Sequence, residues 1–288
     1  MPGILWLASY PKSGNTWMRA FLANLILDAP EPLPLKRIGE VCPSEPAEIW
    51  FRPFTEGKPV AELTAGEIAA LRRQAQERVV SLNKNVVPMK THSYLGEDHG
   101  HPIISMKATF GAVYIIRDPR DVAVSAADHF GRPMDETIEV MADPQALCKR
   151  MPGTIVHELQ SSWSNHVESW TKWNHPGIFT VRYEDLLADP VDQFGRVARH
   201  FGISTDKARI EKAVQFSSFK QLQSLEAEQG FSERSIHSEK FFRAGRSGGW
   251  QDKLTPEQAR RIERDHAAQM QRFGYLEGRA AAQKDAGR

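Results

Sequence analysis

Short apolar runs alternate along the chain with longer stretches in which apolar residues recur at helical spacing. The runs at 4–8, 113–116 and 178–181 predict buried strands. The stretches 17–27 and 191–201 place apolar side chains mostly on one helical face, which predicts amphipathic helices. Strands that alternate with helices favour a parallel sheet that is covered on both faces. The pattern therefore predicts a doubly wound α/β fold, a three-layer sandwich with a central parallel sheet.

Two further stretches predict helices that are exposed on one side. Residues 61–82 mix a few apolar positions with many charges, and residues 256–273 form a charged amphipathic stretch that follows Thr255, a favoured N-cap residue. The last residues, 277–288, are rich in Ala, Gly and charges, and we expect them to be frayed or disordered. The remaining residues, 1–276, then form a single domain.

The charge balance excludes a general attraction to nucleic acid or to membranes. Of the 288 residues, 37 are Lys or Arg and 36 are Asp or Glu, so the net charge is +1 and any binding of an anion must be local. The cysteines, Cys42 and Cys148, belong to no metal or redox motif, as is typical of a reducing compartment. No apolar run approaches the ~20 residues of a membrane span, and the first candidate site begins too early to leave room for a cleavable signal. We expect a cytoplasmic protein without nucleic-acid or membrane partners.

The segment 10–17 (YPKSGNTW) follows the first predicted strand and opens the first predicted helix. A helix start offers unpaired backbone N–H groups and a partial positive charge, and Lys12, Ser13 and Thr16 add an ammonium and two hydroxyls there. Gly14 allows an anion to come close to the backbone. Because the lysine precedes the glycine, unlike in the pattern GxxxxGK[ST], ordinary ATP or GTP hydrolysis is not favoured. The segment indicates phosphate binding, and a glycine-containing turn with a solvated lysine is the alternative.

A second buried strand that turns into a helix spans 113–125 (VYIIRDPRDVAVS). Arg117 ends the strand and Ser125 lies about two turns into the helix, so both side chains could reach one phosphate beyond the carboxyl edge of the sheet. The chain thus predicts a second phosphate site. The charged residues between them fit helix capping and mutual pairing better than ligand contact: Asp118, Arg120 and Asp121.

With a third segment, 243–250 (RAGRSGGW), the chain resembles the PAPS-dependent sulfotransferases of the soluble, cytosolic type. That family carries a YPKSGTTW-like loop for the 5′-phosphosulfate, an RxxxDxxxS-like strand and helix for the 3′-phosphate, and an RxGxxGxW-like loop that closes over the cofactor. The segments 90–92 (KTH) and 182–186 (RYEDL) also match, so the resemblance extends from Ile4 to Trp250. It implies a fold like that of the P-loop nucleotide kinases, PAPS as sulfuryl donor and PAP as product, with no metal.

The resemblance also assigns individual residues to the cofactor. Two of them depart from the family pattern, because Asn15 replaces the usual threonine and Ala244 stands where many members have a lysine. For Phe219, packing in the core is an equal alternative. The residues assigned to the 5′-phosphosulfate are Lys12, Ser13, Gly14, Asn15 and Thr16, with Trp17 beside the adenine. Those assigned to the 3′-phosphate are Arg117, Ser125, Arg243, Ala244 and Gly245, and those on the adenine side are Tyr183, Ser217 and Phe219.

Sulfuryl transfer needs an acceptor, a sulfur centre and a phosphate leaving group held in line, so positioning and fixed cations supply much of the rate. The resemblance makes His92 the general base, and imidazole suits that role because it titrates near working pH. It also implies that Lys90 contacts the sulfuryl group and the acceptor, while Lys12 stabilises the leaving phosphate. Outside its KxH setting, His92 would be interpreted as a surface or structural histidine.

Three segments fit neither the sheet nor the cofactor motifs, and we assign them to acceptor recognition: 30–55, 130–173 and 227–242, the last as a lid. For the tryptophans of the second segment, Trp163, Trp170 and Trp173, packing against the sheet is the favoured alternative. The acceptor is expected to be a small molecule with a hydroxyl or an amine. The family's KxxxTVxxxE-like dimer motif has no clear counterpart between 251 and 276, so a monomer and a homodimer both remain open. Two other functions also remain open: a small-molecule or nucleoside kinase on a related fold, and a non-catalytic module that binds PAPS or PAP.

Overall fold

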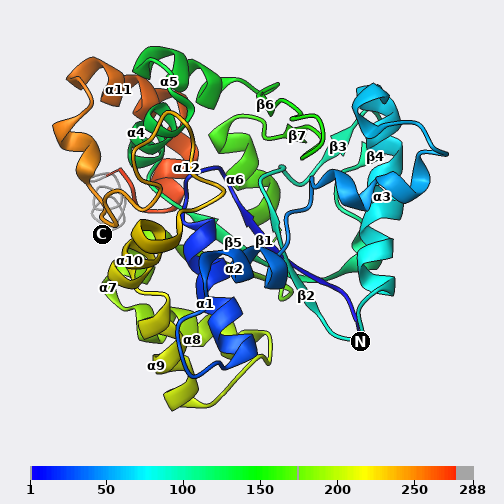
Figure 1. Ribbon diagram of the computed structural model, residues 1–288. Helices are drawn as coiled ribbons and strands as arrows, with labels where there is room; N and C mark the ends of the chain where they lie inside the picture. The colour runs from blue at the N-terminus through cyan, green and yellow to red at the C-terminus, as the bar shows by residue number, and fades with distance from the viewer. Residues whose placement is uncertain (1, 174, 277–288) are drawn as a thin grey trace, which may run out of the picture.

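The computed structural model of the chain describes residues 2–173 and 175–276. Its centre is a four-stranded sheet in the order β2-β1-β5-β8, in which all neighbouring strands are parallel (Figure 1). The predicted strands are confirmed. The strand β5 begins at Thr109, earlier than the predicted start at 113, because Thr109 and Gly111 do not belong to the apolar run from which the strand was predicted. The tail predicted for 277–288 lies outside the described residues. The strands of the sheet are β1 (Ile4–Ser9), β2 (Val87–Thr91), β5 (Thr109–Ile116) and β8 (Ile178–Arg182).

Helices cover both faces of this sheet, which confirms the three-layer arrangement (Figure 1). Alternate residues of β1 show how the layers are divided, since Trp6 packs into one buried cluster and Leu5 and Leu7 pack into the other. On the Leu5 side lie α1 (Asn15–Leu27), α8 (Pro190–His200) and α9 (Lys207–Phe216). On the Trp6 side lie α3 (Ala65–Ser81), α4 (Pro119–Phe130) and α6 (Trp163–Thr171).

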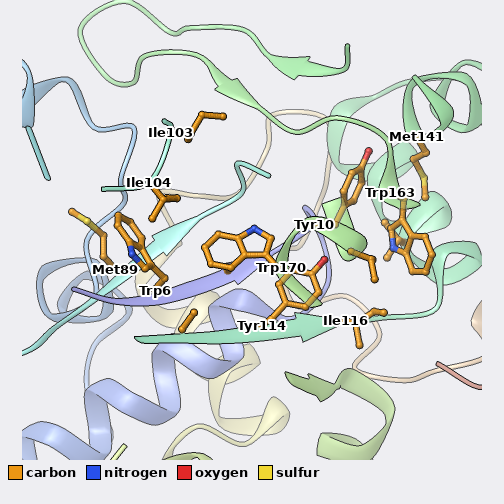
Figure 2. Packing of buried hydrophobic residues seen from close by; sticks show 14 of the residues in the cluster. Trp6, Tyr10, Met89, Ile103, Ile104, Tyr114, Ile116, Met141, Trp163 and Trp170 are labelled. Atoms are coloured by element: carbon orange, nitrogen blue, oxygen red, sulfur yellow. The ribbon is translucent and has the colours of Figure 1, made fainter. Parts of the chain in front are cut away.

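Large aromatic side chains fill the core on the Trp6 side, as Figure 2 shows. The rings of Tyr114 and Trp170 stack with centroids 6.2 Å apart, and Trp6 Nε1 donates to Thr109 Oγ1 at 2.8 Å. The Tyr114 hydroxyl lies 2.9 Å from Nδ1 of the buried His166. Because the polar atoms of Trp6, Tyr114 and Trp170 are hydrogen-bonded, the apolar area of these three rings is buried without the cost of an unpaired donor. This core fixes α6 and β5 behind the carboxyl edge of the sheet.

Two predicted helices have different bounds in the structure. The helix predicted for 61–82 is α3, which begins after Thr64, because Thr64 and Glu67 form a capping box. The prediction of one helix over 256–273 is wrong: α11 (Pro256–Asp265) and α12 (Ala267–Arg272) are separated at His266. The backbone of His266 leaves the helical region at φ −120°, and its buried ring lies 3.0 Å from Ser164 Oγ. A contact with α6 therefore breaks the helix, which a pattern along the chain could not reveal.

The other elements lie around this framework. Within the described ranges, no helix is both long and apolar enough to cross a membrane. The remaining helices are α2 (Leu35–Val41), α5 (Met134–Ala142), α7 (Tyr183–Ala188) and α10 (Phe219–Gln229). Two short hairpins pair β3 (Glu97–Asp98) with β4 (His101–Pro102) and β6 (Leu147–Cys148) with β7 (Glu158–Leu159).

Candidate active site

The carboxyl ends of the parallel strands bring four predicted site residues to one edge of the sheet. Lys12 follows β1, His92 follows β2, and Arg117 follows β5. Tyr183 follows β8 directly, at the first residue of α7. Ligands of open α/β sheets bind beyond this edge, where the strand ends and the helix N-termini face the same space. The structure therefore gathers in space residues that are far apart in the sequence.

The loop between β1 and α1 leaves polar groups without protein partners. Gly14 is the N-cap of α1, and no side chain caps the helix there. The Ser13 hydroxyl is buried and has no hydrogen-bond partner among the described residues. Lys12 has a φ of +67°, in the left-handed region that favours glycine, so the backbone is strained at this turn. A helix N-terminus with free N–H groups, a buried hydroxyl and a lysine is a site for an anion.

Asn15 and Trp17 continue this loop into α1. The side-chain NH₂ group of Asn15 donates to the carbonyl of Leu7 at 2.7 Å and lies 3.3 Å from the Ser9 hydroxyl. Its amide thus holds the end of β1, because a short side chain at this position reaches back to the strand. Trp17 packs edge-to-face on Tyr183 with ring centroids 5.9 Å apart. Gly14 is needed beside them, since a Cβ on it would lie 2.7 Å from the Tyr183 ring and its φ is +103°.

Arg117 joins the first loop to the closing loop, residues 243–250. Its Nη1 donates to the carbonyl of Lys12 at 3.0 Å, and its Nη2 donates to that of Arg246 at 3.2 Å. The guanidinium lies 4.3 Å from the centre of the Tyr183 ring, a cation–π contact. Within the described chain its Nε has no partner. Ser125 lies on α4, the helix that follows Arg117, and its side chain is partly exposed.

The closing loop is held by Asp121, for which the sequence interpretation was wrong. Asp118 does cap α4 and pairs with Arg120, as predicted. Asp121 instead accepts from the backbone N–H of Gly248 at 2.7 Å and of Trp250 at 3.0 Å. Asp121 is the aspartate of the RxxxDxxxS spacing, so the sequence did mark it. Its hydrogen-bond partners, however, lie in a loop far along the chain.

The residues predicted on the adenine side have different surroundings. The Ser217 hydroxyl is buried and donates to the carbonyl of Ala213 at 2.8 Å, at the end of α9. The Phe219 ring lies against Gly245, where an added Cβ would come within 2.5 Å of it. Phe219 therefore packs on the closing loop. Arg243 and Ala244 are exposed, and Arg243 Nη1 lies 3.9 Å from Asp128 Oδ1.

His92 is held in one orientation at the end of β2. Its Nδ1 lies 2.8 Å from the carbonyl of Ser9, and a carbonyl can only accept, so Nδ1 carries the proton and Nε2 is left as an acceptor. Its backbone N–H donates to Glu158 Oε1 at 3.0 Å. Burial, and then the charge of Lys90, hold the pKa of His92 well below its usual value. The imidazole is therefore neutral at pH 7 and can accept a proton.

Two charged residues act on His92, Lys90 at the end of the same strand and Glu233 of the predicted lid, and both also act on Lys12. Burial, then Lys90 and Arg117, lower the pKa of Lys12 from 10.5 to about 8, and its ammonium lies 4.3 Å from the centre of the Phe241 ring. Lys90 Nζ lies 3.4 Å from Oε2 of Glu233, a residue of the predicted lid. Burial alone would raise the pKa of Glu233, but the neighbouring cations outweigh burial and lower it to about 2. Sequence reasoning missed Glu233, because nothing near it in the sequence marks it.

His129 is a second imidazole that the sequence did not indicate. It lies in the last turn of α4, and its ring is 6.0 Å from that of Phe241. Burial, then Lys12 and Lys90, lower the pKa of His129 to about 4. It is therefore also neutral at pH 7, on the side of the site that the predicted lid covers.

Fold and site together define an α/β enzyme with an anion-binding loop beyond its first strand and a histidine and lysines beside it. The sulfotransferase domain family matches residues 2–274, and the chain belongs to this family of enzymes. Among curated proteins, it is 27% identical over 285 residues to sulfotransferase 1A1 of Canis lupus familiaris, covering 95% of this chain and 85% of the relative. It is 26% identical over 289 residues to flavonol 3-sulfotransferase of Flaveria bidentis, covering 91% and 80%.

Solved structures show the same fold. A mouse sulfotransferase, SULT7A1, crystallised with PAP, superimposes with a TM-score of 0.58 at 20% identity, covering 93% of this chain and 84% of that one. Retinol dehydratase in a complex with retinol and PAP gives a TM-score of 0.62 at 20% identity, covering 93% and 81%. At these identities the likeness concerns the fold, which confirms the predicted α/β class.

Proposed function

We propose that this chain transfers a sulfuryl group from PAPS to a hydroxyl or an amine of a small-molecule acceptor and releases PAP. The observation that carries the proposal is the β1–α1 loop, where the buried Ser13 hydroxyl and the helix N-terminus have no side-chain partner among residues 2–173 and 175–276, and Lys12 adds a charge. Those groups fit the terminal anion of the donor. The sulfotransferase family, and the PAP bound in related folds, support the same choice.

PAPS would supply an activated sulfuryl group with a phosphate as its leaving group. The loop residues 12–17 would hold the 5′ end, and Arg117, Ser125 and Arg243 would hold the 3′-phosphate. Arg117 is suited to this role because its Nε has no partner within the described residues. Asn15 contributes through its backbone N–H, since its side-chain NH₂ group is bonded to β1.

The reaction is one in-line displacement. The acceptor atom forms a bond to sulfur, the bond from sulfur to the phosphate oxygen breaks, and the acceptor's proton passes to His92 Nε2. Lys12 then offsets the negative charge that develops on the leaving phosphate, and Lys90 contacts the group in transfer. A neutral His92 and a charged Lys12 at pH 7 are the protonation states that this chemistry needs.

Calorimetric binding of PAP, with ADP as the control and with and without Mg²⁺, tests the proposal. We expect PAP to bind well above ADP and independently of the metal, because the site would read the 3′-phosphate. Equal binding of the two nucleotides, or a need for Mg²⁺, would contradict it and favour the kinase. PAP binding without any PAPS-dependent product across phenol, alcohol and amine acceptors would favour the non-catalytic module.

A further inference from the structure

The lid segment, residues 227–242, places one carboxylate inside the site. Glu233 Oε1 lies 2.7 Å from Nη1 of Arg19, and its Oε2 lies 3.4 Å from Nζ of Lys90. Arg19 belongs to α1 and only 2% of its side chain is exposed. A single carboxylate thus bridges a buried arginine and the lysine next to the proposed base.

We propose that Glu233 is a positioning residue, which fastens the lid over the acceptor side and holds the Lys90 ammonium in place for the reaction. The inference rests on the proposed function. Lysine has a long side chain with many rotamers, so an ammonium without a fixed partner samples many positions. An ion pair to an anchored carboxylate removes that freedom, while the ammonium keeps other N–H groups for the group in transfer.

Arg19 anchors the carboxylate because it is itself fixed. Its Nε donates to the carbonyl of Cys42 at 3.2 Å, and the rest of the guanidinium is packed inside the protein. A buried guanidinium needs an anion, since removing its partner leaves an uncompensated charge in a poorly solvated place. Arg19 has no role in the proposed cofactor site. Its pairing with Glu233 therefore belongs to the lid and not to PAPS.

The lid is also attached independently of Glu233, which makes a clean test possible. Glu226, on α10, accepts from the backbone N–H groups of Phe241 at 2.6 Å and of Phe242 at 3.0 Å. The Ser238 hydroxyl lies 3.0 Å from Asp128 Oδ2 on α4. In Figure 1 the loop that follows α10 lies beside α4 and the end of β1. Loss of the Glu233 contact should free the part of the lid around Glu233 and leave the end at Phe241 and Phe242 in place.

Steady-state kinetics with PAPS tests the role in the reaction. For Glu233→Gln we expect kcat to fall about 10- to 100-fold through misplacement of Lys90, with the KM for PAPS and the affinity for PAP within about twofold of wild type. Glu233→Asp should recover part of the loss, because it restores the charge with a shorter side chain. The matched control is Glu239→Gln, which removes the same charge from an exposed position on the same lid.

The direction of the change in turnover distinguishes the positioning role from an inhibitory one. If the Glu233 carboxylate occupied the place of a substrate anion, Glu233→Gln would raise turnover or lower the KM. Higher turnover, or turnover equal to that of Glu239→Gln, overturns the positioning role.

Hydrogen exchange of the unliganded protein tests the lid without using activity. In Glu233→Gln we expect exchange of the backbone amides of 231–240 to be about tenfold faster, while the Phe241 and Phe242 amides stay as protected as in wild type. Unchanged exchange throughout the lid overturns the fastening role, and so does faster exchange across the whole chain. If wild type transfers nothing from PAPS, the proposed function fails, whereas this measurement still decides whether Glu233 fastens the lid.

Discussion

The cofactor side and the acceptor side of the site are built in different ways. On the proposed cofactor side, short motifs adjoin strand ends and present backbone groups: the loop 10–17, the turn after β5 and the closing loop 243–250. On the acceptor side, side chains from distant segments meet, as Arg19 and Glu233 do at a sequence separation of 214. Backbone anion sites leave a local motif in the sequence, whereas ion pairs between distant segments do not.

The two sides also differ in what holds their loops. Asp121 fixes the closing loop through the backbone N–H groups of Gly248 and Trp250, so these two contacts do not use the side chains of those residues. The first part of the lid depends on the side chain of Glu233, whereas its second end is held by Glu226 through the backbone N–H groups of Phe241 and Phe242. The cofactor side should therefore be insensitive to changes in lid side chains, and the acceptor side should vary with them.

The largest effect is expected for His92, where the two sides meet. His92→Ala should lower kcat about 10²- to 10⁴-fold, because the acceptor's proton loses its base, and it should leave the affinity for PAP unchanged. Turnover with PAPS and calorimetry with PAP measure the two quantities. The exposed His101→Ala is the matched control and should keep full activity. A folded His92→Ala protein that binds PAP and turns over at the wild-type rate would falsify the proposed base.

A smaller effect is expected on the cofactor side from Asp121. Asp121→Ala should weaken PAP binding about 10- to 100-fold, because hydrogen bonds to a charged acceptor contribute about 1.5–3 kcal/mol and here they order the closing loop. The control is Asp252→Ala, which removes an exposed ion pair to Arg246 of the same loop and should change the affinity by no more than about threefold. Equal losses in the two variants would mean that loop charge, and not the Asp121 contacts, governs binding.

How much the sequence could predict follows the same division. Three of the four strands of the sheet, α1 and α4 followed from apolar periodicity, and the turn between β1 and α1 followed from the segment around Gly14, because both are local patterns. The break at His266 coincides with a contact to Ser164 of α6. It was missed because the pattern along the chain does not contain that contact. Glu233 and His129 were missed for the same reason, as their partners lie in other segments.

The smallest expected effect is a pH dependence on the cofactor side. Lys12 has a pKa of about 8, so it is charged below that pH and loses its proton as the pH rises through it. The charged form favours a bound phosphate, and PAP affinity should therefore fall by about tenfold between pH 7 and pH 9.

The charged neighbours of Lys12 are Lys90, Arg117, Asp128 and Glu233. His92 cannot cause the change, because its pKa lies well below this range. Calorimetric titration of PAP across these pH values measures the effect, and Lys12→Gln should bind more weakly with a flat profile. If wild type binds PAP equally at pH 7 and pH 9, then Lys12 carries no charge-dependent part of cofactor binding. The anion would in that case be held by the helix N-terminus and Ser13 alone. Backbone groups would then matter even more on the cofactor side, and the contrast with the acceptor side would be sharper.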